Sequence, residues 1–187
     1  MIKYFCYLFL KRKGWRFESK LPDDLKSFVL IGAPHTSNYD FLPAMSLLYQ
    51  VKRQTRFVIK DFWMKFPFSV LMKPIGGIGI NREKISSSGS QSTTDLIADL
   101  FTQEKELVIL ISPEGTRKRT SKWKTGFYFI AQKANVPLVL AFADYKTRTI
   151  GVGEIIYPSD FNQDMEKIMK FYEKVTGKNP QHFSINI

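Results

Sequence analysis

Cysteine is nearly absent from this chain of 187 residues, which contains Cys6 alone. A single thiol excludes an internal disulfide and a cysteine metal cluster, and such sparse cysteine is typical of a reducing compartment. Histidine is almost as scarce, with only His35 and His182. Without a cysteine pair, two histidines fall short of the ligand sets of ordinary zinc sites, so we predict that the protein binds no metal.

Long apolar runs are also missing. In the N-terminal sequence MIKYFCYLFLKRKGWRF the apolar run ends near Leu10 and is interrupted by Lys3, so it falls well short of the ~20 residues of a transmembrane helix. No small-residue cleavage site follows it, as a signal peptide would require. Aromatic side chains next to KRK are typical of a segment that lies among lipid headgroups; a terminal helix packed on the core is the alternative. We therefore divide the chain into a membrane-interface segment, 1–20, and one folded domain, 21–187.

Acidic residues are outnumbered by basic ones. Lys and Arg total 28 and Asp and Glu total 17, which leaves a net charge of +11. A surface of this sign attracts nucleic acid, acidic proteins or anionic lipid headgroups, and a basic surface kept for solubility is the plain alternative. The apolar fraction of 44% is ordinary for a globular protein, and the length is sufficient for one domain with a substantial core.

Apolar segments of strand type and helix type alternate along the chain. Strands are predicted at 28–33, 55–60, 107–111 and 137–143, with an alternating segment at 148–156 as an edge strand. Helices are predicted at 41–51, 92–104, 126–135 and 164–175, with a short helix broken at Pro67 within 61–73. This alternation predicts an α/β fold: a single domain with a mostly parallel or mixed central sheet covered by helices.

The stretch GAPHTSNYDF places a histidine between a strand and a helix, with an aspartate five positions later. In one continuous helix His35 and Asp40 would lie about 140° apart and would not meet. They can meet if His35 lies in the loop and Asp40 lies in the first helical turn, where Ser37 or Asn38 can cap the helix and its N-terminus favours an ionised carboxylate. Asp40 would then hold one imidazole nitrogen and leave the other as a general base. No nucleophile accompanies the pair, so a substrate hydroxyl would have to serve; a capping aspartate beside an incidental histidine is the alternative.

A glycine-rich segment, GGIGINR at 76–82, is the second candidate for a binding site. Its glycines would let a ligand approach the backbone, and Arg82 is suited to a phosphate or a carboxylate. Taken alone, the segment also reads as a surface turn with a solvated arginine.

The third candidate, SPEGTR, directly follows the apolar strand at 107–111. The carboxyl ends of central strands are where open α/β sheets bind ligands. Arg117, the Thr116 hydroxyl and backbone N–H groups near Gly115 could together hold an oxyanion. The plain alternative is again a surface turn.

Together these segments resemble the glycerolipid acyltransferase family, the group that contains the lysophosphatidic acid (1-acyl-sn-glycerol-3-phosphate) acyltransferases. The family is marked by four ordered blocks, whose order and intervals fit this chain over roughly residues 25–145. The matching segments are the His-x-x-x-x-Asp motif at 35–40, the glycine-containing block ending in Arg at 76–82, Pro-Glu-Gly-Thr-Arg at 113–117, and the Val-Pro-rich block from Val136. The set is far more specific than any one block.

Four positions depart from the family pattern. Pro34, Asn81, Lys118 and Ala141 stand where Asn, Asp, Ser and Pro are common. None of these changes removes a reactive group. They raise the alternative of an acyltransferase of the same fold that acts on a different acceptor, such as an aminolipid or another lysolipid.

The resemblance implies a glycerolphosphate acyltransferase-like fold and an O-acyltransferase of phospholipid biosynthesis. Such an enzyme transfers a fatty acyl group from acyl carrier protein (acyl-ACP) or coenzyme A (acyl-CoA) to the hydroxyl of a lysophosphatidic-acid-like lipid. In this chain His35 would take the proton from that hydroxyl and Asp40 would orient and charge the imidazole, with no metal and no cofactor. The residues expected to bind substrate are Arg82, Glu114, Gly115, Thr116, Arg117, Lys60, Gly76 and Gly77. Among them Glu114 is expected to act by positioning, because a carboxylate repels a phosphate.

Both substrates carry chains that prefer lipid, so a domain without a spanning helix has to dock on a bilayer. Aromatic and basic residues at 2–17 and 60–73 could provide the contact, and each cation near an anionic leaflet adds ~1 kcal/mol. We expect peripheral or monotopic contact with an anionic membrane at the cytoplasmic face of the cell membrane, and the same surface could attract an acidic ACP. A nucleic-acid-binding module would explain the charge and the aromatics but neither PHTSNYD nor PEGTR, so no nucleic acid is expected as partner. A lipid-binding scaffold without turnover is the remaining alternative.

Overall fold

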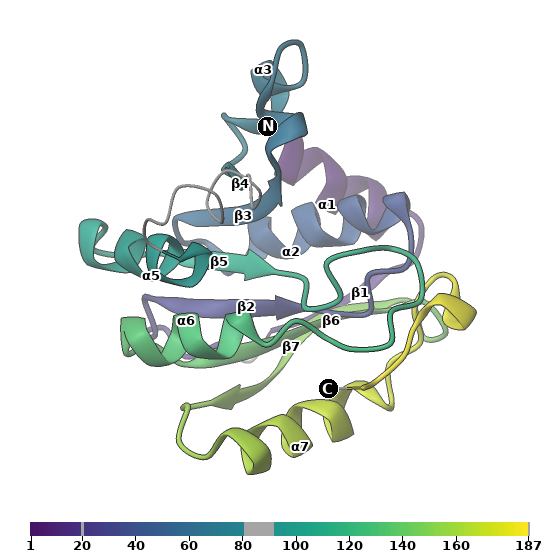
Figure 1. The fold of residues 1–187 in the computed structure, drawn as a ribbon. Coiled ribbons are helices and arrows are strands. Elements are labelled where there is room, and N and C mark those ends of the chain that lie inside the picture. Colours follow the sequence, from purple (N-terminus) through teal and green to yellow (C-terminus); the bar gives the residue numbers. More distant parts are fainter. Residues whose placement is uncertain (20, 81–91, 187) are drawn as a thin grey trace.

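The computed structural model describes residues 1–19, 21–80 and 92–186, which form an α/β domain around a central sheet (Figure 1). In the described residues the sheet has seven strands in the order β1-β7-β6-β2-β5-β3-β4. Its strands are β1 (Arg16–Glu18), β2 (Phe28–Gly32), β3 (Thr55–Lys60), β4 (Gly77–Ile80), β5 (Val108–Ile111), β6 (Leu138–Asp144) and β7 (Thr149–Ile156). Neighbouring strands are parallel except β6 and β7, which confirms the predicted mostly parallel or mixed sheet.

Helices cover both faces of this sheet. Those described are α1 (Ile2–Arg12), α2 (Phe41–Val51), α3 (Ser69–Met72), α5 (Thr93–Gln103), α6 (Gly126–Ala134) and α7 (Phe161–Tyr172), with short 3-10 turns η1 (Asn38–Asp40), η2 (Asp61–Met64) and η3 (Pro180–His182). Helices α1 and α2 share one hydrophobic cluster with the sheet, and α5, α6 and α7 share the other. Figure 1 shows α1 and α2 behind the sheet and α6 and α7 in front of it.

Strand β2 shows why the central strands read as continuous apolar runs. Its residues Phe28, Val29, Leu30 and Ile31 are all fully buried. Val29 and Ile31 belong to the cluster under α5, α6 and α7, whereas Phe28 and Leu30 belong to the cluster under α1 and α2. Side chains of a strand alternate between faces, so a strand covered on both faces needs apolar residues at every position.

The prediction that the segment at 148–156 is an edge strand is wrong. Strand β7 lies between β6 and β1, and β1 pairs only with its first residues, from Thr149 to Gly151. Strand β1 has only three residues, which is too short for an alternating pattern to predict it from the sequence. The rest of β7, residues 152–156, has no partner on the side of β1 among the described pairings. Its alternating pattern therefore resembles that of an edge strand.

The N-terminal segment packs on the domain. Cys6 and Leu10 of α1 are buried, and the rings of Tyr4 and Tyr7 each lie 5.3 Å from that of Tyr49 on α2. Phe5, on the other side of the helix, is 69% exposed. Among the residues that the structure describes, no helix is both long and apolar enough to cross a bilayer. The membrane contact of residues 1–20 stays a prediction.

The connection from β3 to β4 leaves the body of the domain (Figure 1). The sequence predicts a short helix broken at Pro67 here, and the structure has the turn η2 before this proline and the one-turn helix α3 after it. We call residues 61–72 the apolar protrusion, because most of its side chains are hydrophobic and none is fully buried.

Candidate active site

Two loops meet at one edge of the sheet and bring the histidine motif beside the PEGTR motif. Strands β2 and β5 are parallel neighbours, with Ile31 opposite Ile111, so the loops that follow them start side by side. The first loop carries His35 and the second carries Glu114. This edge is formed by the carboxyl ends of the strands, which is where open α/β sheets place their sites.

Asp40 is held by the start of the helix that follows the histidine loop. Ser37 caps the turn η1 and forms a capping box with Asp40. The Asp40 Oδ2 atom accepts hydrogen bonds from the backbone amides of Thr36 and Ser37, both at 2.8 Å. These amides would otherwise lack partners at the helix start, so the local sequence T-S-N-Y-D itself fixes the carboxylate.

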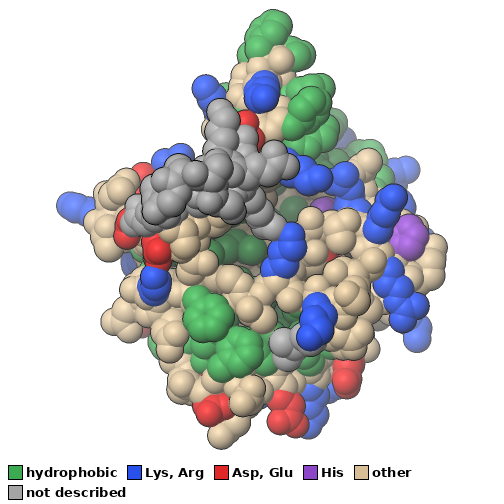
Figure 2. Space-filling model, in the orientation of Figure 1, with side chains coloured by type: hydrophobic (Ala, Val, Ile, Leu, Met, Phe, Trp, Pro, Cys, Tyr) green, Lys and Arg blue, Asp and Glu red, His purple; other side chains and the backbone are tan. Residues whose placement is uncertain are grey.

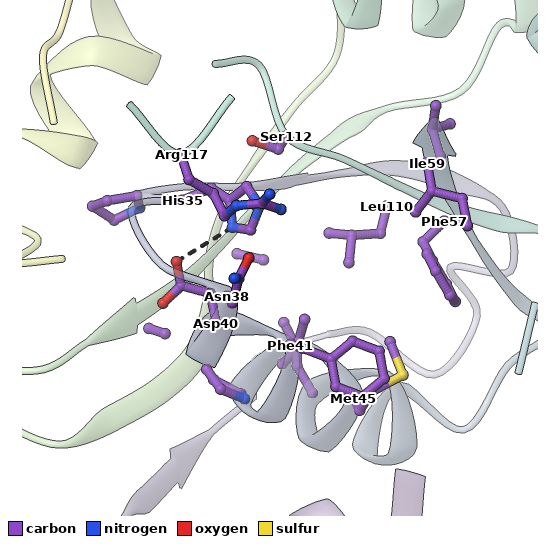
Figure 3. Close-up of a pocket in the computed structure, with 18 of the residues that line it drawn as sticks. His35, Asn38, Asp40, Phe41, Met45, Phe57, Ile59, Leu110, Ser112 and Arg117 are labelled. Carbon is purple, nitrogen blue, oxygen red and sulfur yellow. Dashed lines mark ion pairs between the residues drawn. The ribbon is translucent and has the colours of Figure 1, made fainter. Parts of the chain in front are cut away.

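His35 and Asp40 meet as the motif predicts. The Nδ1 atom of His35 lies 3.3 Å from Asp40 Oδ2, and the imidazole is 31% exposed whereas the carboxylate is 8% exposed. Figure 3 shows the imidazole between Asp40 and the cavity. Because Nδ1 faces the carboxylate, the opposite nitrogen, Nε2, is the one that can exchange a proton with a bound molecule.

The surroundings keep Asp40 ionised. Burial alone would raise its pKa, but hydrogen bonds from the His35 and Tyr145 side chains and the Ser37 backbone outweigh burial, so the pKa is lowered. An ionised Asp40 favours the proton on Nδ1 and stabilises a positively charged imidazole.

Tyr145 is a member of this network that motif spacing did not indicate. Its hydroxyl donates a hydrogen bond of 2.6 Å to Asp40 Oδ1, and its ring packs edge-on against Trp15 at 5.0 Å. Burial and the bond to Asp40 raise the pKa of the phenol, so the hydroxyl stays a donor. Tyr145 lies in the turn between β6 and β7, downstream of all four motifs, and the parallel pairing of β6 with β2 brings it near Asp40.

Glu114 lies behind the histidine and outside the cavity. It is 4% exposed, and its Oε1 and Oε2 atoms accept hydrogen bonds from the His35 amide at 3.0 and 2.8 Å. The Ser112 hydroxyl lies 3.1 Å from Oε2. Burial raises the pKa of Glu114 to about 7. These contacts fix the backbone at His35, so they support a positioning role for Glu114.

An apolar pocket of about 570 Å³ opens beside the His–Asp pair. Figure 3 shows His35, Asn38, Asp40 and Arg117 at one end and Phe57 and Ile59 at the other. The lining residues are Gly32, Pro34, His35, Asn38, Asp40, Phe41, Pro43, Ala44, Met45, Leu47, Phe57, Val58, Ile59, Trp63, Leu71, Met72, Leu110, Ser112, Arg117, Ala141, Phe142, Ala143 and Ile150. A cavity with a few polar groups at one end suits a ligand with a reactive head and an aliphatic chain.

The last three residues of the PEGTR block, from Gly115 to Arg117, lie at the surface. Arg117 is exposed and lines the pocket, whereas the Thr116 hydroxyl accepts a hydrogen bond from the Lys118 amide at 3.2 Å. Gly115 adopts a positive φ of 63°, and a Cβ there would lie 3.2 Å from the Lys124 side chain. Arg117 is therefore the residue of this block that the structure brings to the cavity.

The glycine-rich block has a different setting from the one predicted. Gly77 begins strand β4, and Gly76 has a φ of 101°, where a Cβ would overlap the carbonyl oxygen of Thr55. Neither glycine lines the pocket. The absence of a side chain here lets β4 pack closely against the rest of the chain, and not a ligand against the backbone. Lys60, at the end of β3, is exposed and also does not line the pocket. Arg82 lies outside the described residues.

The described residues contain no group of three or more His, Cys, Asp or Glu side chains that could hold a metal ion. The His35–Asp40 pair is an imidazole oriented by a carboxylate at the polar end of an apolar cavity.

An imidazole oriented in this way is able to take a proton from a hydroxyl group or a water molecule. The family model described as Acyltransferase matches residues 16–141, which is more than half of the chain, and the protein therefore belongs to the Acyltransferase family. This confirms the family-level resemblance drawn from the four motifs.

A solved structure shows the same fold. The crystal structure of the 1-acyl-sn-glycerophosphate (LPA) acyltransferase PlsC from Thermotoga maritima is similar with a TM-score of 0.61 and 17% sequence identity, over 93% of this chain and 75% of that one. A comparison with curated proteins found no match.

Proposed function

We propose that the protein transfers a fatty acyl group from acyl-ACP or acyl-CoA to the hydroxyl of a lysophosphatidic-acid-like lipid, as a step of phospholipid biosynthesis. One observation carries the proposal: the His35–Asp40 pair lies at the polar end of an apolar pocket that also receives Arg117. Membership of the Acyltransferase family and the fold shared with an LPA acyltransferase support it.

The geometry suggests a direct transfer between the two substrates. Nε2 of His35 takes the proton of the acceptor hydroxyl while Asp40 stabilises the charge that the ring gains. The resulting oxyanion attacks the thioester carbonyl carbon and forms a tetrahedral intermediate. When this collapses, the carbon–sulfur bond breaks and the thiolate takes the proton from His35. The oxygen ester, the free thiol and the neutral histidine remain, and no acyl-enzyme is formed.

The apolar part of the pocket would hold the acyl chain. Its walls come from α2, β3 and the apolar protrusion, with Met45, Ile59 and Leu71 as examples. Each methylene removed from water contributes about 0.8 kcal/mol, so the chain supplies binding energy that holds the thioester beside His35.

Arg117 would bind the acceptor headgroup. A guanidinium matches the geometry of a phosphate or carboxylate, and Arg117 lines the pocket at the same end as His35. Thr116, Gly115 and Arg82 stay proposed contributors to the headgroup site. A second candidate is the same reaction on another acceptor, such as an aminolipid or a different lysolipid; Asn81 and Lys118, which depart from the family pattern, favour testing it.

The proposal includes peripheral contact of the protein with an anionic membrane, at the cytoplasmic face, and no role for nucleic acid. The membrane contact rests on the net charge of +11 and on the exposed aromatic residues. The exclusion of nucleic acid rests on the PHTSNYD and PEGTR motifs, which a nucleic-acid-binding module would not explain.

The test compares two histidine variants of the purified protein. His35→Ala should lower the rate of acyl transfer by about 10²–10⁴-fold, the usual contribution of a general base, with unchanged circular dichroism. His182→Ala is the matched control, because it removes the chain's other histidine, which lies in η3 and does not line the pocket. Transfer by His35→Ala at a near-normal rate would refute the assignment.

The acceptor is then identified with a panel. The wild-type protein is offered one acyl thioester with lysophosphatidic acid, an uncharged monoacylglycerol, other lysolipids and an aminolipid in turn. The highest kcat/KM on lysophosphatidic acid supports the first candidate, and a higher value on another member replaces it.

A further inference from the structure

The apolar protrusion exposes hydrophobic side chains to an unusual degree. Phe66 is 84% exposed and Val70 is 69% exposed. The others of this set are Phe62, Trp63, Phe68 and Leu71. Figure 2 shows hydrophobic side chains gathered at the top of the molecule, over the part that Figure 1 labels α3. Exposed apolar groups that lie together mark an interaction surface.

Three rings inside the protrusion support one another. The ring centroids lie 5.7 Å apart for Phe62 and Trp63, 5.5 Å for Phe62 and Phe68, and 4.9 Å for Trp63 and Phe68. Aromatic rings at such separations attract one another beyond what their buried area alone contributes. The cluster therefore forms a base from which the more exposed Phe66 and Val70 extend.

The protrusion also forms one wall of the pocket. Trp63, Leu71 and Met72 line the cavity that holds His35. Trp63 and Leu71 are at the same time 37% and 45% exposed. The apolar surface outside the domain is thus continuous with the apolar surface inside the pocket.

Basic residues flank the apolar tip. Lys60, Lys65 and Lys73 are exposed and lie just before, within and just after the protrusion, whereas Asp61 is its one acidic residue. Figure 2 shows Lys and Arg side chains beside the hydrophobic tip. Each cation near an anionic leaflet strengthens binding to it. An apolar tip bordered by cations matches the layering of a bilayer, with anionic headgroups above hydrocarbon.

We propose that the apolar protrusion inserts into an anionic lipid bilayer and that the pocket opens there, so that an aliphatic chain passes between bilayer and pocket along Trp63, Leu71 and Met72. The passage of a chain rests on the proposed function; the insertion stands on the exposed residues and the flanking lysines alone. A bilayer fits this surface better than a second copy of the protein, because a second copy would place the same lysines against one another.

The fluorescence of Trp63 reports directly whether the protrusion inserts. The chain has 3 tryptophans, and Trp15 and Trp123 are 9% and 4% exposed, whereas Trp63 is 37% exposed. On vesicles of phosphatidylcholine and phosphatidylglycerol its emission should shift to shorter wavelength, and lipids brominated along the acyl chain should quench it. Binding without quenching would place the protrusion outside the hydrocarbon and would overturn insertion. Self-association in sedimentation that vesicles do not reverse would assign the surface to a second copy, and would overturn it as well.

Substitutions at the tip separate insertion from catalysis. Val70→Asp and Phe66→Ser should each weaken vesicle binding by about tenfold or more, because each removes an apolar side chain from the inserted set. Tyr157→Asp is the matched control, since Tyr157 is 69% exposed outside the protrusion, and it should bind vesicles normally. Transfer between short-chain substrates that are monomeric in water should stay at the wild-type rate in both tip variants.

These measurements keep the two proposals distinguishable. If the wild type binds vesicles and Trp63 is quenched but no acyl transfer occurs, the proposed function fails and insertion stands. If transfer occurs and the tip variants bind vesicles as the wild type does, insertion fails and the proposed function stands.

Discussion

The Tyr145 hydroxyl donates a hydrogen bond of 2.6 Å to Asp40 Oδ1, on the opposite side of the carboxylate from the Oδ2 atom that faces His35. Both oxygens of Asp40 are therefore occupied, one by a phenol and the other by an imidazole and two backbone amides. A carboxylate held from both sides presents one fixed orientation to the histidine. Tyr145 does not line the pocket, so it can act only through Asp40.

Removal of this hydroxyl should affect turnover and leave substrate binding unchanged. A hydrogen bond to a charged group contributes about 1.5–3 kcal/mol, and the loss in Tyr145→Phe should appear as a fall in kcat of roughly tenfold or more with KM unchanged. Steady-state kinetics on the purified variant check this. Tyr39→Phe is the control, because it also removes a tyrosine hydroxyl. It keeps the Tyr39 ring, which packs under the Lys178 ammonium at 3.7 Å. If Tyr145→Phe changed KM alone, Tyr145 would not act through Asp40.

Glu114 should give the protein a characteristic dependence of stability on pH. Its pKa rises from the ordinary 4.5 to about 7 on folding, mainly through burial. Between these values the folded protein binds more protons than the unfolded chain, so the free energy of unfolding falls as pH rises from about 4.5 to 7 and then levels off. The effect of this one group is on the order of 3 kcal/mol, at about 1.4 kcal/mol per pKa unit.

Glu114→Gln removes the ionisation and keeps one acceptor oxygen for the His35 amide. Urea unfolding is followed across this pH range. As pH rises, the free energy of unfolding of the wild type should fall relative to that of the variant. Equal slopes for the two proteins would contradict the assignment. Glu114→Ala should lower both stability and activity, because it leaves the half-buried His35 amide without its partner, at a cost of about 1–3 kcal/mol.

Long periodic segments allowed the elements to be predicted from local sequence. The predicted bounds of α2 and β3 are those observed, since each is closed by residues that end it, such as Lys52 in the left-handed conformation after α2. Helix α7 begins at Phe161, earlier than predicted, because Asp160 caps it by accepting from the Gln163 amide. The neighbours of β7 could not be predicted, because sheet order depends on contacts between segments far apart in the chain.

The same distinction between local patterns and contacts of distant segments applies to the site. The pairing of His35 with Asp40 followed from short spacing and helix capping, which are local rules. The contacts of Tyr145 with Asp40 and of Glu114 with the His35 amide span 105 and 79 positions, and no local pattern encodes them. The glycines at 76 and 77 illustrate the converse: a glycine shows that something approaches closely, but the sequence does not say whether it is a ligand or another strand.

Arg117 should control affinity for a charged acceptor. Arg117→Ala is expected to raise KM for lysophosphatidic acid by roughly tenfold or more with little change in kcat, because it removes hydrogen bonds between two charged groups. The uncharged monoacylglycerol should be unaffected. Lys118→Ala is the matched control, since it removes the adjacent exposed cation, which does not line the pocket. Equal losses in the two variants would indicate general attraction by positive charge in place of a specific contact.

Ile59 lies at the end of the pocket away from His35 (Figure 3) and should limit the length of the acyl chain. Ile59→Trp fills part of this end, so the variant should discriminate against long donors and retain activity on shorter ones. Each methylene that no longer fits costs about 0.8 kcal/mol, so two excluded methylenes should lower kcat/KM by more than tenfold. A series of acyl-CoA or acyl-ACP donors of increasing length measures this, with Ile59→Leu as a control of similar volume. A uniform loss at every length would mean that the chain does not reach Ile59, and the far end of the pocket would then lie beyond the bound substrate.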